Sequence, residues 1–224
     1  MIKKPKESLV DKAYSLIKKK IITLEFKPGM KLEEKALISE IGIGRTPIRE
    51  AIKMLISEGL IISFGKNSIY VKELTLKSAR DLMSLLYYLG DVIFSLASRN
   101  EDYTILIREL ENHLLRMEEA IRKEEYSDFA LHNSKFHKTL AKISGNEYLE
   151  ALFDKLYNEE KRLSFIISLE KLNGDPIRSY YEKVQEQHQE LVELLKTKNF
   201  EGLKKAYQTH MKVGQTRLFR YFSQ

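Results

Sequence analysis

The pattern of apolar and polar positions changes about a third of the way along the chain. Before residue 75, short segments with apolar residues at helical or alternating spacing are separated by three of the four prolines and five of the ten glycines. After it, one proline, Pro176, interrupts long stretches in which apolar residues recur at helical spacing. This pattern predicts a small mixed domain over residues 1–75 and a larger, nearly all-helical domain over residues 76–224.

The first domain has the element order of a winged helix-turn-helix. The expected elements are a helix that begins after Ser8, a second helix within residues 32–41, a third helix from about residue 44 to residue 59, and β-rich runs at residues 60–64 and 69–72. Pro47 falls in the first turn of the third helix, where its missing N–H costs nothing, and Gly59 suits its C-terminal cap. Three helices followed by a small β-hairpin wing predict a DNA-binding fold within a mainly α protein.

Two arginines four residues apart, Arg45 and Arg49, stand at the start of the third helix. The helix dipole disfavours basic residues there, so an ordinary amphipathic helix does not call for them. In a helix-turn-helix this helix start meets the major groove of DNA, and the arginine donor fork fits phosphate or the edge of guanine. The position therefore predicts that both arginines contact DNA.

The net charge is concentrated in the same part of the chain. Residues 1–75 carry 15 Lys and Arg against 9 Asp and Glu, a net of +6, which equals the net charge of all 224 residues. A localised basic segment is typical of a polyanion binder, although charge alone fits a lysine-rich solvated surface equally well. The net charge therefore supports DNA binding by the first domain but does not indicate it without Arg45 and Arg49.

The stretch "FKPGMKLEEKALISEIGIGRTPIREAIKMLISEGLI" resembles the DNA-binding half of the GntR-type bacterial transcription regulators. The resemblance covers roughly residues 8–72. It implies a dimer on a palindromic operator, with DNA contacts from Lys35, Arg45, Thr46, Arg49, Asn67 and Ser68. The sequence departs from the family pattern at Gly44, where serine is usual, and at Ser68 in the wing, where glycine is usual.

Three of the five histidines lie on apolar faces of separate predicted helices, and they are His137, His188 and His210. Asn133 precedes His137 by four residues, so both side chains can address one ion. One inward histidine is ordinarily a hydrogen-bonded core residue, and the spacing alone leaves that reading open beside a metal site between bundle helices. His113 and His132 fall off the apolar rows and are expected at the surface.

The segments "HNSKFHKTLAKISGNEYL" and "EQHQELVELLKTKNFEGLKKAYQTHM" resemble the FCD effector-binding domain of the FadR branch of these regulators. The resemblance implies an antiparallel α-helical bundle holding a divalent metal and often a small carboxylate. Its ligands would be Asn133, His137, His188 and His210, a nitrogen-rich set that favours Zn or Ni, with Mn as a further candidate. Asn133 replaces the usual aspartate, and Leu89 stands where an arginine is common, so the effector is expected to differ from the usual organic acid.

Residue types and motifs that the sequence lacks exclude several classes of protein. The chain has no cysteine, no uninterrupted apolar run of membrane-spanning length and no apolar leader segment, so a cytoplasmic protein without membrane association is expected. A metal-dependent enzyme and a regulator with a purely structural metal are the alternatives. Because no phosphate loop, nucleophile elbow or dinucleotide fingerprint is found, the sequence predicts a ligand-responsive, dimeric transcription repressor and not an enzyme.

Overall fold

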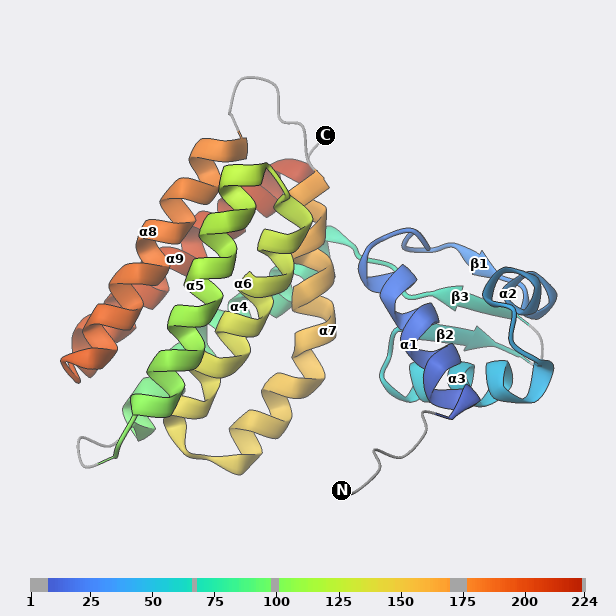
Figure 1. Cartoon of the computed structure of the whole chain (residues 1–224), viewed down its shortest axis with the longest axis horizontal. Helices are drawn as coiled ribbons and strands as arrows, with labels where there is room; N and C mark the ends of the chain where they lie inside the picture. Colours follow the sequence, from blue (N-terminus) through green and yellow to red (C-terminus); the bar gives the residue numbers. More distant parts are fainter. Residues whose placement is uncertain (1–7, 66–67, 98–100, 170–176, 223–224) are drawn as a thin grey trace, which may run out of the picture. The chain divides into compact units, whose positions relative to one another are not determined.

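A computed structural model describes residues 8–65, 68–97, 101–169 and 177–222. The chain separates into two compact units, Met1–Leu74 and Thr75–Gln224 (Figure 1). Each unit has its own buried core and is described by itself.

The N-terminal unit contains three helices, α1 (Leu9–Ile22), α2 (Glu34–Ile41) and α3 (Arg45–Ser57). Ser8 caps α1 by accepting a hydrogen bond from the Asp11 backbone N–H, and α2 ends at Gly42 in the left-handed conformation. Such an N-cap contributes about 1 kcal/mol to helix stability. Ile17 of α1 and Leu55 of α3 are fully buried, so these two helices form the centre of the small core.

A three-stranded antiparallel sheet completes the unit, with strand order β1-β3-β2. Its strands are β1 (Lys31–Leu32), β2 (Ile61–Phe64) and β3 (Ser68–Val71). The last two are the predicted wing, with Ile61 opposite Val71. The two-residue strand β1 was not predicted, because two residues show no alternating pattern. The winged helix-turn-helix is confirmed, with one more strand than expected.

The C-terminal unit is a bundle of long helices. They are α4 (Leu76–Leu96), α5 (Thr104–Lys123), α6 (Tyr126–Ala141), α7 (Glu147–Leu169), α8 (Ile177–Lys196) and α9 (Phe200–Phe222), with a short 3-10 turn at Lys142–Ser144. In Figure 1, α5, α6 and α7 lie side by side, while α9 packs against both α4 and α8. The predicted mainly α fold is confirmed. No helix within the described ranges combines the length and apolar character needed to cross a bilayer.

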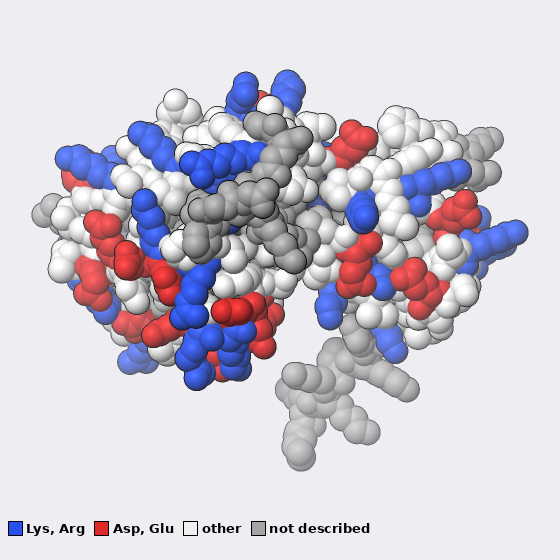
Figure 2. All heavy atoms as spheres, turned by 90° about the horizontal axis from the view of Figure 1, so that it is seen from above, with Lys and Arg blue, Asp and Glu red and all other residues white. Residues whose placement is uncertain are grey.

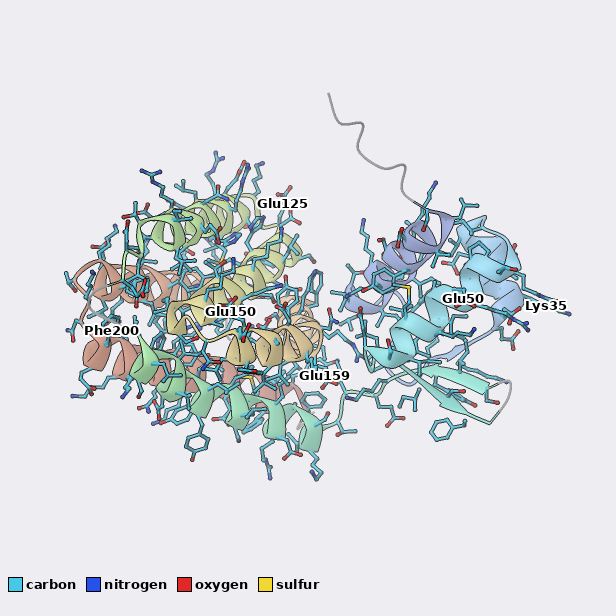
Figure 3. All side chains as sticks on the ribbon, turned by 90° about the horizontal axis from the view of Figure 1, so that it is seen from below. Lys35, Glu50, Glu125, Glu150, Glu159 and Phe200 are labelled. Carbon is cyan, nitrogen blue, oxygen red and sulfur yellow. The ribbon has the colours of Figure 1, made fainter. Side chains whose placement is uncertain are left out.

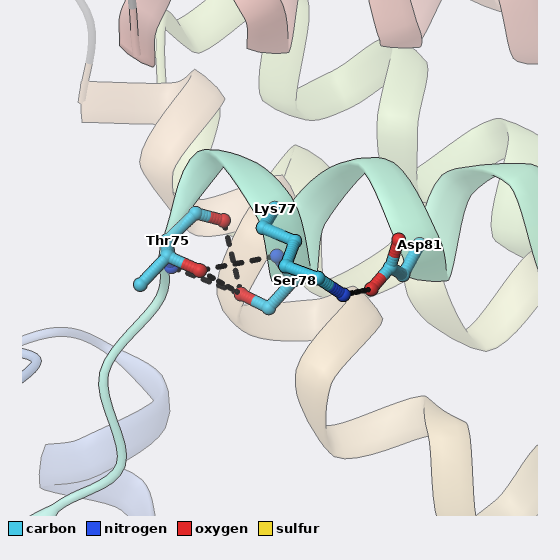
Figure 4. Close-up of polar contacts among 4 residues, drawn as sticks. All are labelled: Thr75, Lys77, Ser78 and Asp81. Atoms are coloured by element: carbon cyan, nitrogen blue, oxygen red, sulfur yellow. Dashed lines mark hydrogen bonds and ion pairs between the residues drawn. The ribbon is translucent and has the colours of Figure 1, made fainter.

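The second unit begins with a reciprocal cap at the start of α4 (Figure 4). The Thr75 backbone N–H donates to Ser78 Oγ at 2.9 Å, and the Ser78 backbone N–H donates to Thr75 Oγ1 at 3.1 Å. One turn further on, Lys77 Nζ pairs with Asp81 at 2.5 Å. This arrangement satisfies donors that a helix start would otherwise leave unpaired, so α4 begins sharply where the first unit ends.

Gly90 explains how α4 and α9 approach closely. A Cβ atom at this position would lie 2.3 Å from the ring of Tyr207 on α9, so only a residue without a side chain fits. The Tyr207 hydroxyl donates to the Leu86 carbonyl oxygen at 3.4 Å, one turn before Gly90. The contact fixes Tyr207, which lines the cavity described below.

Candidate DNA-binding surface and metal centre

The start of α3 presents three predicted DNA-contacting residues to solvent. Gly44 is the N-cap, and Arg45, Thr46 and Arg49 follow on the exposed side. The opposite side of the helix is held in the core by Ile48, Ala51, Ile52 and Leu55. The side chains of Arg45 and Arg49 are 61% and 58% exposed, so both can reach a ligand without rearrangement of the fold.

Glu34, the first residue of α2, lies between the two arginines. Arg49 Nε donates to Glu34 Oε2 at 2.8 Å, and Arg45 Nε lies 3.0 Å from Oε1 of the same carboxylate. Since α3 has no acidic residue in its first turn, this carboxylate from a neighbouring helix offsets the two positive charges at the helix start.

The other predicted DNA contacts are spread around this helix. Lys35 is exposed on α2, at the outer edge of the unit in Figure 3. Ser68 is half-buried at the start of β3, and Asn67 lies outside the described residues. Figure 2 shows basic and acidic side chains interspersed over the visible face, so the candidate DNA surface rests on the position of α3 and not on net charge.

In the C-terminal unit, three buried histidines from three helices converge. They are His137 of α6, His188 of α8 and His210 of α9, and their ligand atoms all lie within 4.8 Å of one another. His210 Nε2 lies 3.1 Å from His137 Nε2 and 3.2 Å from His188 Nε2. In a tetrahedral site, nitrogen ligands about 2.0–2.1 Å from a zinc ion lie about 3.3–3.4 Å apart, so a small outward shift of these rings would let them share one ion.

Burial keeps the three imidazoles neutral. It lowers the pKa of His137 to about 4, and it lowers the pKa of His188 and His210 well below the usual value, with a further contribution from the neighbouring rings. A histidine binds a metal through a neutral ring nitrogen, so at neutral pH all three rings have the form that a ligand needs.

The second ring nitrogen of His210 is held in place. Its Nδ1 lies 3.2 Å from Oε1 of Gln187 on α8, which fits the hydrogen bond that orients a metal-binding imidazole. The Nδ1 atoms of His137 and His188 are buried without a hydrogen-bond partner among the described residues. The ring centroids of Phe136 and His188 lie 4.4 Å apart, so the two rings pack against each other. Donor type, spacing and orientation therefore fit a divalent transition metal.

A cavity opens beside the histidines, with about 60 Å³ accessible to water-sized molecules. Asn133, His137 and His210 line it together with Glu160 and Ser164 of α7, and most of the remaining lining is apolar. Asn133 Nδ2 donates to Ser164 Oγ at 3.2 Å and to Glu160 at 3.5 Å. Burial raises the pKa of Glu160 to about 7.

His113 and His132 differ from the prediction that both lie on the surface. Both rings are half-buried between α5 and α6, and their Nδ1 atoms are 3.2 Å apart. They fall outside the apolar rows of their helices, but the antiparallel packing of α5 and α6 brings their edges together. Burial lowers the pKa of His113 to about 4. Leu89 is buried in α4 and does not line the cavity.

Sequence reasoning missed two acidic residues, Glu34 and Glu160. Nothing local links Glu34 to Arg49, which follows 15 residues later. Glu160 had a usable signal, because it falls on the apolar row formed by Leu156, Leu163 and Ile167 of α7. A carboxylate on a row that faces the core is a candidate functional group.

A basic helix start in a winged helix-turn-helix, followed by a helical bundle with a histidine-lined cavity, defines a DNA-binding regulator with a ligand-binding domain. Residues 9–71 match the bacterial regulatory proteins of the gntR family, and residues 89–213, more than half of the chain, match the FCD domain. The chain belongs to the GntR family and is a DNA-binding transcription regulator with an FCD domain. As predicted, it is not an enzyme.

Relatives support the family assignment along most of the chain. The HTH-type transcriptional regulator YdhC of Bacillus subtilis is 28% identical, over 88% of this chain and 85% of that protein. The gluconate operon transcriptional repressor of Bacillus subtilis is 24% identical, over 84% and 75%. The solved structure of E. coli McbR/YncC has the same fold, with a TM-score of 0.77 and 22% identity over 95% of this chain and 98% of that one.

Proposed function

We propose that the protein is a ligand-responsive transcription repressor that binds a palindromic operator as a homodimer. The observation that carries this proposal is the exposed pair Arg45 and Arg49 at the start of α3. Because Glu34 accepts a hydrogen bond from Arg49 Nε and forms an ion pair with Arg45, both guanidinium groups are held near the start of α3 before DNA binds. A pre-oriented donor fork loses less side-chain entropy when it binds a guanine edge or a phosphate. Lys35, Thr46, Asn67 and Ser68 would add contacts around this pair.

The dimer would form through an apolar stripe on α4. Leu85, Tyr88, Val92 and Leu96 are exposed and recur at helical spacing along one side of this helix. Tyr88 is 64% exposed, which is unusual for an aromatic residue in a row of this kind. A second copy of the chain would bury the stripe and present two recognition helices to successive major grooves.

The effector domain would hold one divalent metal through His137, His188 and His210, with Asn133 adding an amide oxygen. Zn or Ni suits the three nitrogen ligands best, and Mn is a further candidate. Bound metal would offer an open position to an effector. No described residue that lines the cavity is a lysine or arginine, so a small carboxylate would depend on the metal as its cationic partner.

Effector binding would be coupled to DNA through the arrangement of the two units. A ligand shifts a conformational equilibrium only by its differential affinity for the two states. An effector that favours one arrangement would change the spacing of the two recognition helices and so the affinity for a fixed operator. The gluconate operon repressor among the relatives makes repression the favoured direction.

Selection of duplex DNA from a random library by the full-length protein tests the DNA and dimer parts together. We expect an enriched sequence with two inverted half-sites, bound by a species with twice the chain mass. Val92→Arg should give a monomer with weaker operator binding, whereas Leu115→Arg, at an exposed leucine of α5, should leave the dimer intact. Failure to enrich any sequence would contradict the proposed function.

A further inference from the structure

The proposed ligand set of the metal centre carries no negative charge. His137, His188 and His210 are neutral imidazoles, and Asn133 supplies at most an amide oxygen. A divalent ion among these buried groups would bring two positive charges into a region from which water is largely excluded. Buried charge is costly unless an opposite charge lies close to it, so the centre needs an anionic group.

Glu160 of α7 is the carboxylate available for this purpose. It is 8% exposed, and it lines the same cavity as His137 and His210. No other aspartate or glutamate is found among the described residues that line this cavity, and no lysine or arginine among them competes for the carboxylate. The buried arginine of α9, Arg217, packs its guanidinium 4.4 Å from the centre of the Tyr180 ring and is not a lining residue.

The two oxygens of Glu160 have different surroundings. Oε1 accepts a hydrogen bond from Ser164 Oγ at 2.9 Å and a longer one from Asn133 Nδ2 at 3.5 Å. Oε2 is buried and accepts no hydrogen bond of good geometry from a described residue, although the Ser134 hydroxyl lies close enough to Glu160 to favour its ionised form. A buried acceptor in this state loses its hydration without compensation, unless a cation or a donor occupies the cavity. Ser164 and Asn133 hold one oxygen, and the other remains available.

We propose that Glu160 is the anionic partner of the metal centre, contributing from α7 the negative charge that the histidines and Asn133 do not provide. This inference rests on the proposed metal binding. Glu160 lies outside the group of ring nitrogens within 4.8 Å of one another, so it acts from the cavity wall as a positioning and charge-balancing residue. A divalent ion together with the single negative charge of Glu160 would have a net charge of +1, which an effector carboxylate would neutralise.

Glu160→Gln tests the charge while keeping the shape of the side chain and its hydrogen bond from Ser164. In the full-length protein, competition with a chelator should show that Zn²⁺ affinity falls about tenfold or more, the range found when an outer partner of a metal site is removed. The melting temperature of the metal-free variant should stay the same or rise, because a buried charge is removed. Glu159→Gln, at the preceding residue of α7, should bind Zn²⁺ like the wild type.

A sharper test moves the negative charge from one helix to another by mutation. Because Asn133 lies against Glu160, the double variant Asn133→Asp, Glu160→Gln moves the carboxylate from α7 to α6 within the same cavity. It should recover most of the Zn²⁺ affinity that Glu160→Gln loses. A residue that only supports the packing of α7 would not be rescued in this way.

The inference is overturned if Glu160→Gln keeps wild-type Zn²⁺ affinity, if Glu159→Gln loses as much, or if the double variant recovers nothing. In these cases the wild type still binds Zn²⁺, so the proposed metal centre stands. If the wild-type protein binds no Zn²⁺, the metal centre fails and this inference fails with it. Operator binding, measured separately, reports on the rest of the proposed function.

Discussion

Arg49 at the start of α3 donates from Nε to Glu34 Oε2 of α2 at 2.8 Å. Arg45 approaches the other oxygen of the same carboxylate at 3.0 Å. Glu34 therefore accepts a hydrogen bond from Arg49 and forms an ion pair with Arg45, so one carboxylate contacts both arginines at the start of α3. The contact joins the two helices of the helix-turn-helix at the point where the motif would meet DNA, and it gives the first two predictions.

Replacing Arg45 or Arg49 with alanine should weaken operator binding by about 1–3 kcal/mol if the arginine reads a base. The melting temperature should change little, because exposed ion pairs contribute at most about 1 kcal/mol. Fluorescence anisotropy with labelled operator measures the first effect and thermal unfolding the second. Arg116→Ala removes an exposed arginine and its ion pair on α5 and serves as the control. Unchanged operator affinity in both variants would show that α3 is not the recognition helix.

Glu34→Gln should change specificity more than affinity. The variant releases both arginines from their shared carboxylate and removes a negative charge that would lie close to DNA phosphates. Binding to random duplex DNA should therefore become tighter, while the ratio of operator to random affinity should fall. The comparison uses both duplexes at two salt concentrations, with Glu33→Gln as the control for a carboxylate lost from the preceding position. An unchanged affinity ratio would show that Glu34 does not position the arginines.

The winged helix-turn-helix was predictable because its signals are local. Ser8, Gly42 and Pro47 mark helix ends within one turn, and the alternating pattern after Gly59 marks the wing. The strand at Lys31–Leu32 was missed, because it exists through pairing with Ile69 and Tyr70 nearly forty residues later. Pairing of this kind leaves no periodic signal in two residues.

The histidine cluster and its surroundings were predictable to different degrees. The helical pattern showed that His137, His188 and His210 face inward, and the structure brings them together. The same pattern shows which side of a helix a residue occupies but not what packs against it. The contact between His113 and His132 and the approach of Glu160 to Asn133 depend on neighbouring helices, so both were missed.

The His113–His132 pair makes stability sensitive to acid. In the unfolded chain His113 titrates near its usual pKa of 6.5, whereas burial and the charge of His132 lower its pKa to about 4 in the folded chain. Between these pH values the unfolded state binds more protons, so the free energy of unfolding decreases as the pH falls from about 6.5 to about 4. Above pH 6.5 this contribution to stability is fully present.

His113→Gln cannot take up this proton. Urea unfolding at pH 7 and at pH 5 should show a smaller loss of stability for the variant than for the wild type. The other histidines titrate in both proteins, so the difference between the two losses isolates the pair. Equal losses in both proteins would show that His113 is not buried enough to resist protonation.

The metal centre gives the last prediction. Protein purified without chelator should carry close to one divalent ion per chain, measured by elemental analysis, and a chelator should lower its melting temperature. An ion that binds only the folded state stabilises it by mass action, by about 2.7 kcal/mol when its free concentration is a hundred times the dissociation constant. The ion should be retained at pH 6, because burial keeps the imidazoles neutral there, and it should be released as the pH approaches about 4, where His137 takes up a proton.

Alanine at His137, His188 or His210 should abolish metal retention, because each ring supplies one of the three converging nitrogens. His113→Ala and His132→Ala remove the paired histidines between α5 and α6 and should retain the ion, so they control for the loss of a half-buried histidine ring. Asn133→Asp should tighten retention by adding a negative charge next to the ion. If the wild-type protein is free of metal and its melting temperature does not respond to added Zn, Ni or Mn, the three histidines are core residues. Effector binding would then depend on the polar groups of the cavity, Asn133, Glu160 and Ser164, without an ion.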